Sequence, residues 1–470
     1  MNATSQIKNN KHENNNLLEN IVHGGFCIGC GACSTIQGFE GVIELNEFGM
    51  YSPSNLVQTN EVNQKVEKIC PFSGSGPNED EISKQLFHSN NNHSFETGFY
   101  NQLYAGHVNE SDFRAKGTSG GIITWVLTKL IKEDLVDYVI HVKPSSKEDI
   151  FFEYGTSKNS EEIKSGAKSR YYPIEMSKVI DFIKKNNGRY VIVGLPCFVK
   201  AIRRICIEDQ TFDKKIKFCI GLVCGHLKSS GFGESLGWQA DISPNELDSI
   251  DFRVKLKDRP ANKYGYTAST KSKGVTKPME GIMGGNWGHN FFRYPACNYC
   301  DDVFAETADL CVGDAWLDEY TQDSFGSSVV VVRNEEILNI LTKGVKEQSI
   351  QLNQLTEKKL IDSQAGGLRD RREGLAFRLS QKQKKQEWFP TKRVTPSESN
   401  LPKWRKRLYE NRERVSSDSH KVWLRAKQEA NFKYFSEYYL KQERIFTSLV
   451  PANKLHKRIY RKIKNLISQQ

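Results

Sequence analysis

Two alternating patterns of apolar and polar residues run through the middle of the chain. Windows with a helical apolar period predict helices at 122–132, 176–185 and 198–206. Between them, short runs rich in β-branched and aromatic residues predict strands at 138–142, 190–193, 216–223 and 329–332. Helices and strands in alternation are typical of an α/β domain, so we expect a largely parallel sheet within residues 99–380.

The segments on either side of this core have different patterns. Residues 1–22 are polar and asparagine-rich, which predicts a disordered leader rather than a signal peptide. Residues 23–75 form a small domain with a hairpin expected at 41–51, and residues 76–98 are a polar linker. An antiparallel insertion is expected at 250–300, and residues 381–470 predict a basic, helical tail. The predicted fold class is therefore α+β / α/β, and a chain of 470 residues is long enough for two or three domains.

The positive charge of the chain is concentrated in that tail. Residues 381–470 contain 23 Lys and Arg against 8 Asp and Glu, while the whole chain carries +11, so the remainder is slightly acidic. Amphipathic basic segments at 403–409 and 454–464 suit an anionic membrane surface, a partner protein or the chain's own acidic body. Nucleic-acid binding is disfavoured, because no recognition fold accompanies the charge.

The cysteines indicate the cellular compartment. Eleven cysteines concentrated in short motifs indicate metal ligation rather than disulfides. No apolar run approaches the ~20 residues that cross a bilayer. We therefore expect a cytoplasmic protein, with attachment to the inner face of the membrane as one open role for the tail.

The first cysteine motif is CIGCGAC, with Cys27, Cys30 and Cys33, followed at a distance by Cys70-Pro71. In two-cluster ferredoxins the fourth cysteine of such a run ligates the other cluster. Here Gln37 occupies that position, which predicts one 4Fe–4S cluster held by Cys27, Cys30, Cys33 and Cys70. A zinc knuckle is the alternative, although paired CxxC motifs are more usual there.

A second set of cysteines is more widely spread. Cys197 and Cys224 follow two predicted strands, and Cys297 and Cys300 form a lone CxxC motif. Because ligands gather beyond the carboxyl ends of parallel strands, these four cysteines could converge on a second cluster. A zinc half-site or a redox dithiol at 297–300 is equally open from the spacing. Cys206, Cys219 and Cys311 are expected to be buried core thiols.

Two loops could contact an anionic cofactor. The sequence GTSGG at 117–121 precedes an apolar helix, so it suits a phosphate or is an ordinary helix cap. The basic–aromatic loop 165–172 suits a ring-bearing anion or is a solvated surface loop. Neither a complete GxGxxG fingerprint nor a Walker A motif is present.

These segments together resemble the coenzyme F420 hydrogenase/dehydrogenase beta-subunit family, which includes the 7-hydroxymethyl chlorophyll a reductases. The matching pieces occur in family order over residues 23–335: CIGCGAC, GTSGGIITWVLTKLIKEDLVDYVI, KSRYY, VIVGLPCFVKAIRR, LVCGH, FRVK and CNYCDDVFAETADLCVGDAW. The resemblance implies a ferredoxin-like 4Fe–4S domain, an FAD-binding core and a core 4Fe–4S cluster on the second cysteine set. It also implies flavin or substrate contacts, namely Thr118, Ser119, Gly120, Gly121, Ser169, Arg170, Tyr171 and Asp314, with Asp309 in the same pattern. Arg170 stands where many members have Lys, which keeps the charge but changes the hydrogen-bond geometry.

The expected function is an iron–sulfur flavoprotein oxidoreductase. Electrons would pass between a ferredoxin-like protein, the clusters, FAD and a small organic substrate. Members of the family serve F420-dependent enzymes, chlorophyll metabolism and surface-polysaccharide pathways, so the substrate stays open. The competing interpretation is a non-catalytic subunit that passes electrons to a partner protein, and a zinc-stabilised binding protein is a third.

Overall fold

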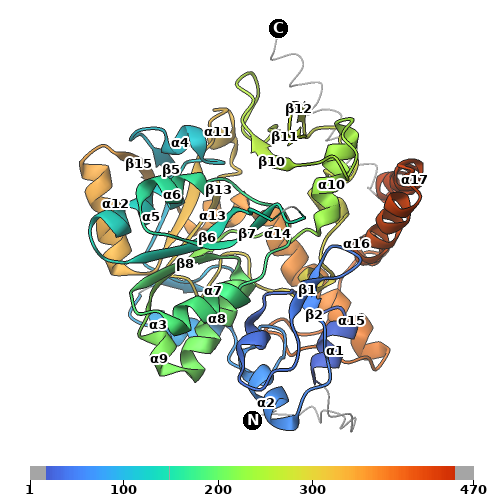
Figure 1. The fold of residues 1–470 in the computed structure, drawn as a ribbon, viewed down its shortest axis with the longest axis horizontal. Helices are drawn as coiled ribbons and strands as arrows, with labels where there is room; N and C mark the ends of the chain where they lie inside the picture. Colours follow the sequence, from blue (N-terminus) through green and yellow to red (C-terminus); the bar gives the residue numbers. More distant parts are fainter. Residues whose placement is uncertain (1–16, 91, 148, 450–470) are drawn as a thin grey trace.

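A mixed eight-stranded sheet lies at the centre of the molecule (Figure 1). A computed structural model describes residues 17–90, 92–147 and 149–449 of the chain. The strand order is β15 (Ile350–Gln354), β5 (Gln102–Val108), β14 (Ser328–Val332), β13 (Leu310–Asp314), β9 (Ile216–Leu222), β8 (Tyr190–Gly194), β6 (Tyr138–Pro144) and β7 (Phe152–Ser157).

The prediction of an α/β core is confirmed, but the sheet is parallel only in its middle. The neighbours β13, β9, β8 and β6 run parallel to one another, whereas β7, β14, β5 and β15 pair antiparallel. A parallel neighbour needs a crossover of a dozen or more residues, and the short loop from β6 to β7 cannot make one. The expectation of a largely parallel sheet is therefore wrong at both edges.

Helices cover both faces of the sheet. Strand β8 shows why, because Tyr190 and Ile192 enter one apolar core while Val191 and Val193 enter the other. One face carries α5 (Ile122–Lys132), α6 (Ser160–Ser165) and α12 (Glu335–Lys346), and the other carries α7 (Ser177–Lys185), α8 (Pro196–Glu208) and α9 (Gln210–Asp213). The helix and strand periods in the sequence locate α5, α7 and α8 within two residues at each end.

The N-terminal segment packs directly against α7 and α8. It contains α1 (Leu17–His23), a 3₁₀ turn (Ala32–Thr35), the hairpin of β1 (Ile43–Leu45) and β2 (Tyr51–Pro53), and α2 (Asn60–Ile69). Phe26, Ile28 and Phe72 belong to the same apolar core as α8. The predicted leader is wrong for residues 17–22, since Leu18 and Ile21 are buried in α1; residues 1–16 lie outside the described part.

The segment expected as a polar linker contains regular structure. Helix α3 (Glu79–Phe87) begins with a capping box between Asn78 and Glu81, and β3 (Asn92–Ser94) pairs with β4 (Gly98–Tyr100). The sequence did not predict this helix because its polar residues look solvated, whereas some of them form ion pairs inside the protein. Glu79, for example, pairs with Lys200 of α8 at 3.0 Å. The prediction of a polar linker over residues 76–98 is therefore wrong for residues 79–87, which form a helix.

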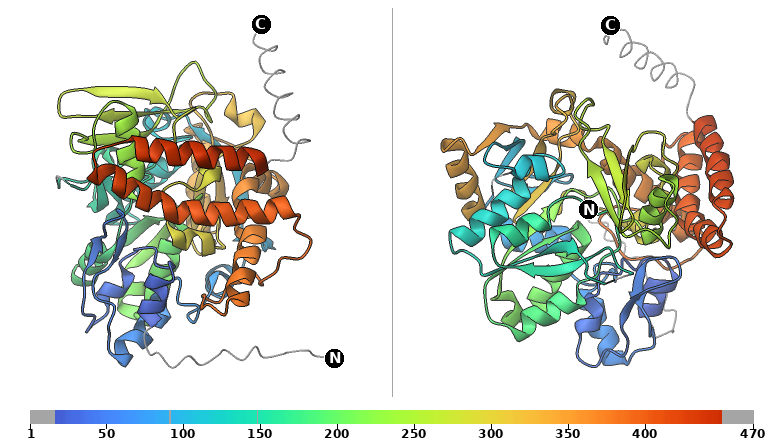
Figure 2. Two further views of the ribbon diagram at one scale, coloured as in Figure 1. Left: turned by 90° about the vertical axis from the view of Figure 1, so that its right-hand side faces the viewer. Right: turned by 45° about the horizontal axis from the view of Figure 1, so that its top comes forward.

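The antiparallel insertion is present as β10 (Ser249–Val254), β11 (Gly265–Ser269) and β12 (Gly274–Pro278). After it, the chain returns across the core through α13 (Glu357–Ser363), α14 (Ala365–Arg369), a π-helical turn (Asp370–Gly374) and α15 (Leu375–Lys384). The tail then forms α16 (Lys403–Gln428) and α17 (Lys433–Leu449), which lie side by side (Figure 2). In the described part of the chain, no helix combines the length and apolarity needed to span a membrane.

The described part of the basic tail docks on the protein itself. Trp423, Phe435 and Phe446 are buried in a third apolar core with α10 (Ser230–Gln239) and the insertion. Of the three roles open for this tail, residues 403–449 therefore make an intramolecular contact. The second basic segment, 454–464, lies outside the described residues.

We expect His420 of α16 to make this docking sensitive to acid. Its Nε2 donates to the Arg293 carbonyl and its Nδ1 accepts from the Ser229 hydroxyl, each at 3.1 Å, and burial lowers its pKa from 6.5 to about 4. The neutral ring stabilises the fold above pH 6.5, and this contribution is lost as the pH falls towards 4. We expect the shift to cost up to about 3 kcal/mol of unfolding free energy in denaturant titrations. His420→Gln should flatten the profile over this interval, and an unchanged slope would contradict the assignment.

Candidate functional site

The first four cysteines come together at the base of the N-terminal segment. Cys27, Cys30 and Cys33 lie along the loop and the 3₁₀ turn that follows it, and Cys70 ends α2 as its C-cap residue. Burial raises the pKa of each thiol, and Cys70 raises the pKa of each of the first three further. The sequence separates Cys33 from Cys70 by a hairpin and a helix, and the fold closes this gap.

Two glycines shape the loop between these thiols. Gly29 and Gly31 have φ values of +69° and +82°, a region that favours glycine. A Cβ on Gly29 would lie 2.3 Å from the Tyr51 carbonyl oxygen, so the hairpin leaves no room for a side chain. The Gly29 N–H donates to the Cys27 sulfur at 3.4 Å, and hydrogen bonds of this kind to sulfur tune the reduction potential of iron–sulfur clusters.

The second set of cysteines also converges. Cys197 lies at the second position of α8, and the nearby thiols of Cys224, Cys297 and Cys300 all raise its pKa. Cys297 and Cys300 come from a 3₁₀ turn (Pro295–Tyr299) and the residue after it, and the Cys297 sulfur accepts from the Leu227 N–H at 3.3 Å. The start of a helix favours negative charge, so α8 suits thiolates at this point.

The two cysteine sets are neighbours. Burial raises the pKa of Tyr154, and Cys197 of the second set and Cys30 of the first raise it further. Helix α8 joins the sets, because it begins next to Cys197 and its Arg204 donates to the carbonyl oxygen of Cys70. This proximity is what electron transfer between two centres requires.

The remaining three cysteines lie in the apolar core. Cys206 is on α8, Cys219 is on β9 and Cys311 is on β13, and all are buried. No disulfide joins any of the eleven cysteines. Within the described residues, no three His, Cys, Asp or Glu side chains are placed to hold one metal ion.

A cavity of about 250 Å³ lies beyond the carboxyl ends of β8, β9 and β13. It brings together seven of the eight residues expected to contact a flavin or substrate, namely Thr118, Ser119, Gly121, Ser169, Arg170, Tyr171 and Asp314. Arg170 is partly buried, and its Nε has no hydrogen-bond partner among the described residues. Cys224 also lines this cavity, so the second cysteine set borders it.

Gly120 has a different place. Its N–H donates to the Ser328 hydroxyl at 3.1 Å, and a Cβ there would lie 2.5 Å from the Gly106 carbonyl oxygen. The structure thus uses Gly120 to pack the loop against β5 and β14, outside the cavity lining. Ser119 and Thr118 are braced as well, since Ser119 donates to the Ser327 carbonyl and Thr118 accepts from the Ser169 N–H.

The two aspartates of the ADLCVGD segment have separate roles. Asp314 accepts two hydrogen bonds from Arg253, at 3.0 and 3.1 Å, and Arg253 also donates to the Tyr171 hydroxyl. Asp309 lies elsewhere, where it accepts from Arg203 and from the Cys219 N–H, both at 2.7 Å. Asp314 therefore belongs to the cavity, whereas Asp309 fastens β13 to β9 and α8.

A second cavity of about 470 Å³ adjoins the first through residues that line both, among them Tyr171, Cys224, His226 and Asp314. Ligand cavities are typically about 300–1,000 Å³. Aromatic side chains form part of its wall, namely Tyr171, Tyr264, Trp287 and Trp316. The lining of this cavity carries more positive than negative charge. It contains five arginines and two aspartates, namely Arg253, Arg293, Arg369, Arg371 and Arg412, and Asp314 and Asp370.

His226 and Arg371 are functional candidates that the sequence did not single out. His226 is buried against Trp287, its Nε2 has no hydrogen-bond partner among the described residues, and burial holds its pKa well below the usual value. Arg371 is 1% exposed, and the neighbouring thiols of Cys300, Cys224 and Cys297 raise the pKa of its guanidinium. A fully buried guanidinium beside three cysteines needs an anionic neighbour. A 4Fe–4S cluster on four thiolates carries net negative charge and fits this requirement.

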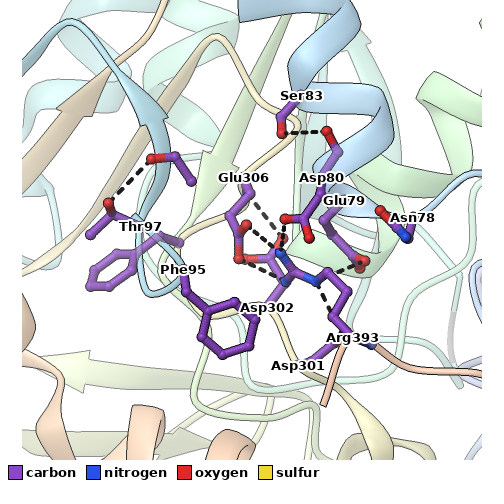
Figure 3. Close-up of polar contacts among 12 residues, drawn as sticks. Asn78, Glu79, Asp80, Ser83, Phe95, Thr97, Asp301, Asp302, Glu306 and Arg393 are labelled. Carbon is purple, nitrogen blue, oxygen red and sulfur yellow. Dashed lines mark hydrogen bonds and ion pairs between the residues drawn. The ribbon is translucent and has the colours of Figure 1, made fainter. Parts of the chain in front are cut away.

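A buried charge network joins the tail to α3 and to the segment that follows Cys300 (Figure 3). Arg393 contacts Glu306 at 2.6 and 2.8 Å, Asp80 at 2.7 Å and Asp301 at 3.4 Å. Asp301 directly follows Cys300, so this network holds the CxxC segment from its outer side. Lys392 and Arg393 look like two exposed loop charges in the sequence, so the sequence did not predict this network.

Comparison with known proteins places this site in a family. Residues 103–181 match the family model for the N-terminal part of the coenzyme F420 hydrogenase/dehydrogenase beta subunit, and residues 187–358 match the model for its C terminus. A chain of the F420-reducing [NiFe] hydrogenase complex from Methanosarcina barkeri is similar with a TM-score of 0.46 and 16% identity, over 59% of this chain and 91% of that chain. No curated protein sequence matches. The two family matches together span more than half of the chain, which is therefore a member of the oxidoreductase-related coenzyme F420 hydrogenase/dehydrogenase beta-subunit family.

Proposed function

We propose that this family member is an iron–sulfur flavoprotein oxidoreductase with two 4Fe–4S clusters and one FAD. The observation that carries the proposal is the arrangement of the cysteines. Two sets of four thiols adjoin each other, and Cys224 of the second set lines both cavities. A ferredoxin-like protein is the expected partner of the first set, because three of its cysteines are only half-buried.

FAD is assigned to the first cavity, from which it would extend into the adjoining second cavity, because about 250 Å³ is below the usual size of a ligand cavity. Arg170 and Lys168 line one wall of this cavity. Lys168 is paired with Asp251, whereas no ion pair joins Arg170 to Asp or Glu among the described residues, so its guanidinium gives the wall a positive charge suited to a pyrophosphate. Lys255 supports the adjoining GTSGG loop by donating to the Ser119 carbonyl at 3.0 Å. Bound FAD exchanges electrons singly with clusters and in pairs with organic substrates. The role of this chain's residues is to hold the ring near Cys224 and exclude water.

The second cavity is assigned to the organic substrate. Its positive lining and aromatic walls suit a planar molecule with carboxylate or phosphate groups. His226 and Asp314 line both cavities, so they can contact the substrate and orient it against the flavin. Coenzyme F420 and metabolites of surface-polysaccharide pathways remain the candidate substrates.

Anaerobic purification followed by metal, acid-labile sulfide and flavin analysis tests this proposal. We expect about eight irons with matching sulfide and one FAD per chain. Zinc without sulfide would overturn the proposal, and four irons with FAD would overturn the core cluster alone. Steady-state assays then separate two roles: if only a partner protein accepts electrons, the chain is an electron-transfer subunit.

Arg170→Gln tests the flavin site specifically. Loss of one charged donor to a phosphate should weaken FAD binding by roughly ten- to a hundredfold, since such a contact contributes roughly 1.5–3 kcal/mol. The dissociation constant can be measured by fluorescence during flavin titration of the apoprotein. Iron content should be unchanged. Lys158→Gln, which removes a surface cation near Tyr138, is the control and should leave FAD affinity at the wild-type value. Equal affinities in all three proteins would contradict the assignment.

A further inference from the structure

Arg371 lies in the π-helical turn Asp370–Gly374, beyond the two segments that match the family models. π-Helical turns are rare and often mark functional positions. The side chain is 1% exposed, yet the sequence around it, LRDRREG, reads as a solvated charged run. The two family matches therefore do not cover this buried cation.

The turn grips the segment that carries Cys297 and Cys300. Arg372 donates to the Asp301 carbonyl, and Arg378, further along in α15, donates to the Asn298 carbonyl at 2.8 Å. These two hydrogen bonds hold the turn that carries Arg371 against the CxxC segment, and Cys300 raises the pKa of the Arg371 guanidinium. Two neighbouring arginines therefore fix the position of Arg371 beside this segment.

The charge of Arg371 is not neutralised by a carboxylate. Its neighbour Asp370 pairs with Arg293 at 2.9 Å and with Arg378 at 3.2 Å. Among the described residues no ion pair joins Arg371 to Asp or Glu, and its strongest electrostatic partners are Cys300 and Cys224. The guanidinium therefore acts mainly on the second cysteine set.

The same guanidinium also lines the second cavity. An anion held in that cavity would lie beside a cation that otherwise serves the cysteines. Charges interact strongly in a site shielded from water, so the anion would offset part of the effect of Arg371 on the cysteines.

We propose that Arg371 sets the reduction potential of the core cluster and couples it to occupancy of the second cavity by an anion. This inference rests on the proposed function. Reduction adds one negative charge to a cluster, so a fixed buried cation favours the reduced state and raises the potential. An anion in the cavity lowers the potential again, which makes the cluster release its electron more readily when substrate is bound.

Redox titration of the purified holoprotein, followed by electron paramagnetic resonance, tests whether Arg371 sets the potential of the core cluster. In Arg371→Gln one of the two clusters should shift to lower potential by at least a tenfold change in the reduced-to-oxidised ratio, or about 59 mV for one electron. Arg371→Lys keeps the charge and should shift less. The control Arg407→Gln removes an exposed arginine of α16 that lines neither cavity, and it should leave both potentials unchanged.

The coupling to anion binding is tested with 4-methylumbelliferyl phosphate as the anionic probe. Uncharged 4-methylumbelliferone, which lacks the phosphate, is the control ligand. Calorimetry should show phosphate-dependent binding, and the bound anion should lower the potential of the same cluster in the wild type but not in Arg371→Gln. Absence of binding, or binding without a shift, overturns the coupling. Unchanged potentials in eight-iron Arg371→Gln, or loss of the core cluster in both Arg371 variants, overturn the tuning role. A wild type without two clusters instead refutes the proposed function itself.

Discussion

Replacing Cys70 by serine should remove about four of the expected eight irons and leave the flavin spectrum intact. Cys70 completes the first cysteine set from the end of α2, and three remaining thiols hold a cubane poorly. The flavin cavity lies beyond the sheet strands and contains no residue of the first set. Iron and sulfide analysis, with the visible absorption spectrum, measures both effects in one preparation.

Cys206→Ala is the matched control for this experiment. Cys206 lies on the buried face of α8, and its electrostatic neighbours are Cys219, Arg203 and Asp213 rather than either cysteine set. Its replacement should leave iron, sulfide and flavin at the wild-type values. Loss of iron from this variant would show that the ligands of the core cluster have been misassigned.

Arg393→Met should produce the largest loss of stability of any single substitution considered. Arg393 is buried among Glu79, Asp80, Asp301 and Glu306, and the last of these has two contacts with it. Removing one partner of a buried ion pair leaves uncompensated charge and typically costs about 3–5 kcal/mol. Chemical denaturation of the holoprotein measures this loss as a lower midpoint.

Arg425→Met provides the comparison on the surface of α16. Its pair with Glu429 is exposed, so its removal should change the unfolding free energy by no more than about 0.5 kcal/mol. Similar losses in the two variants would mean that the Arg393 network does not hold the tail to the core. A double variant of Arg393→Met with Glu306→Gln should recover part of the loss, because one uncompensated carboxylate is then neutral.

Local patterns in the sequence predict much of the fold. The helix Ile122–Lys132 is located to the residue, because its apolar face repeats with the helical period and charged residues end it. The grouping of Cys27, Cys30 and Cys33 follows from their spacing, since three residues at intervals of three can face a common centre. Strand runs such as Tyr190–Val193 are recognisable because both of their faces are buried.

The parts that could not be predicted depend on contacts between distant segments. Arg253, Arg371 and Arg393 read as surface charges, and only the fold reveals their partners at Asp314, Cys300 and Glu306. Helix α3 escapes prediction for the same reason, because acidic residues near its start pair inside the molecule. The signal available in the sequence is a dense charged run between helix-forming segments, which has the same composition whether it is solvated or paired.

The position of Arg371 and Arg412 in the wall of the second cavity has a consequence for how the protein is made. A ribosome releases Cys70 roughly 300 residues before Arg371, a delay of about 15–60 s at common synthesis rates. The first cysteine set can therefore receive iron while the chain is still growing. The second set stays open until the last helices close over it, so we expect cluster insertion to proceed from the N-terminal site to the core.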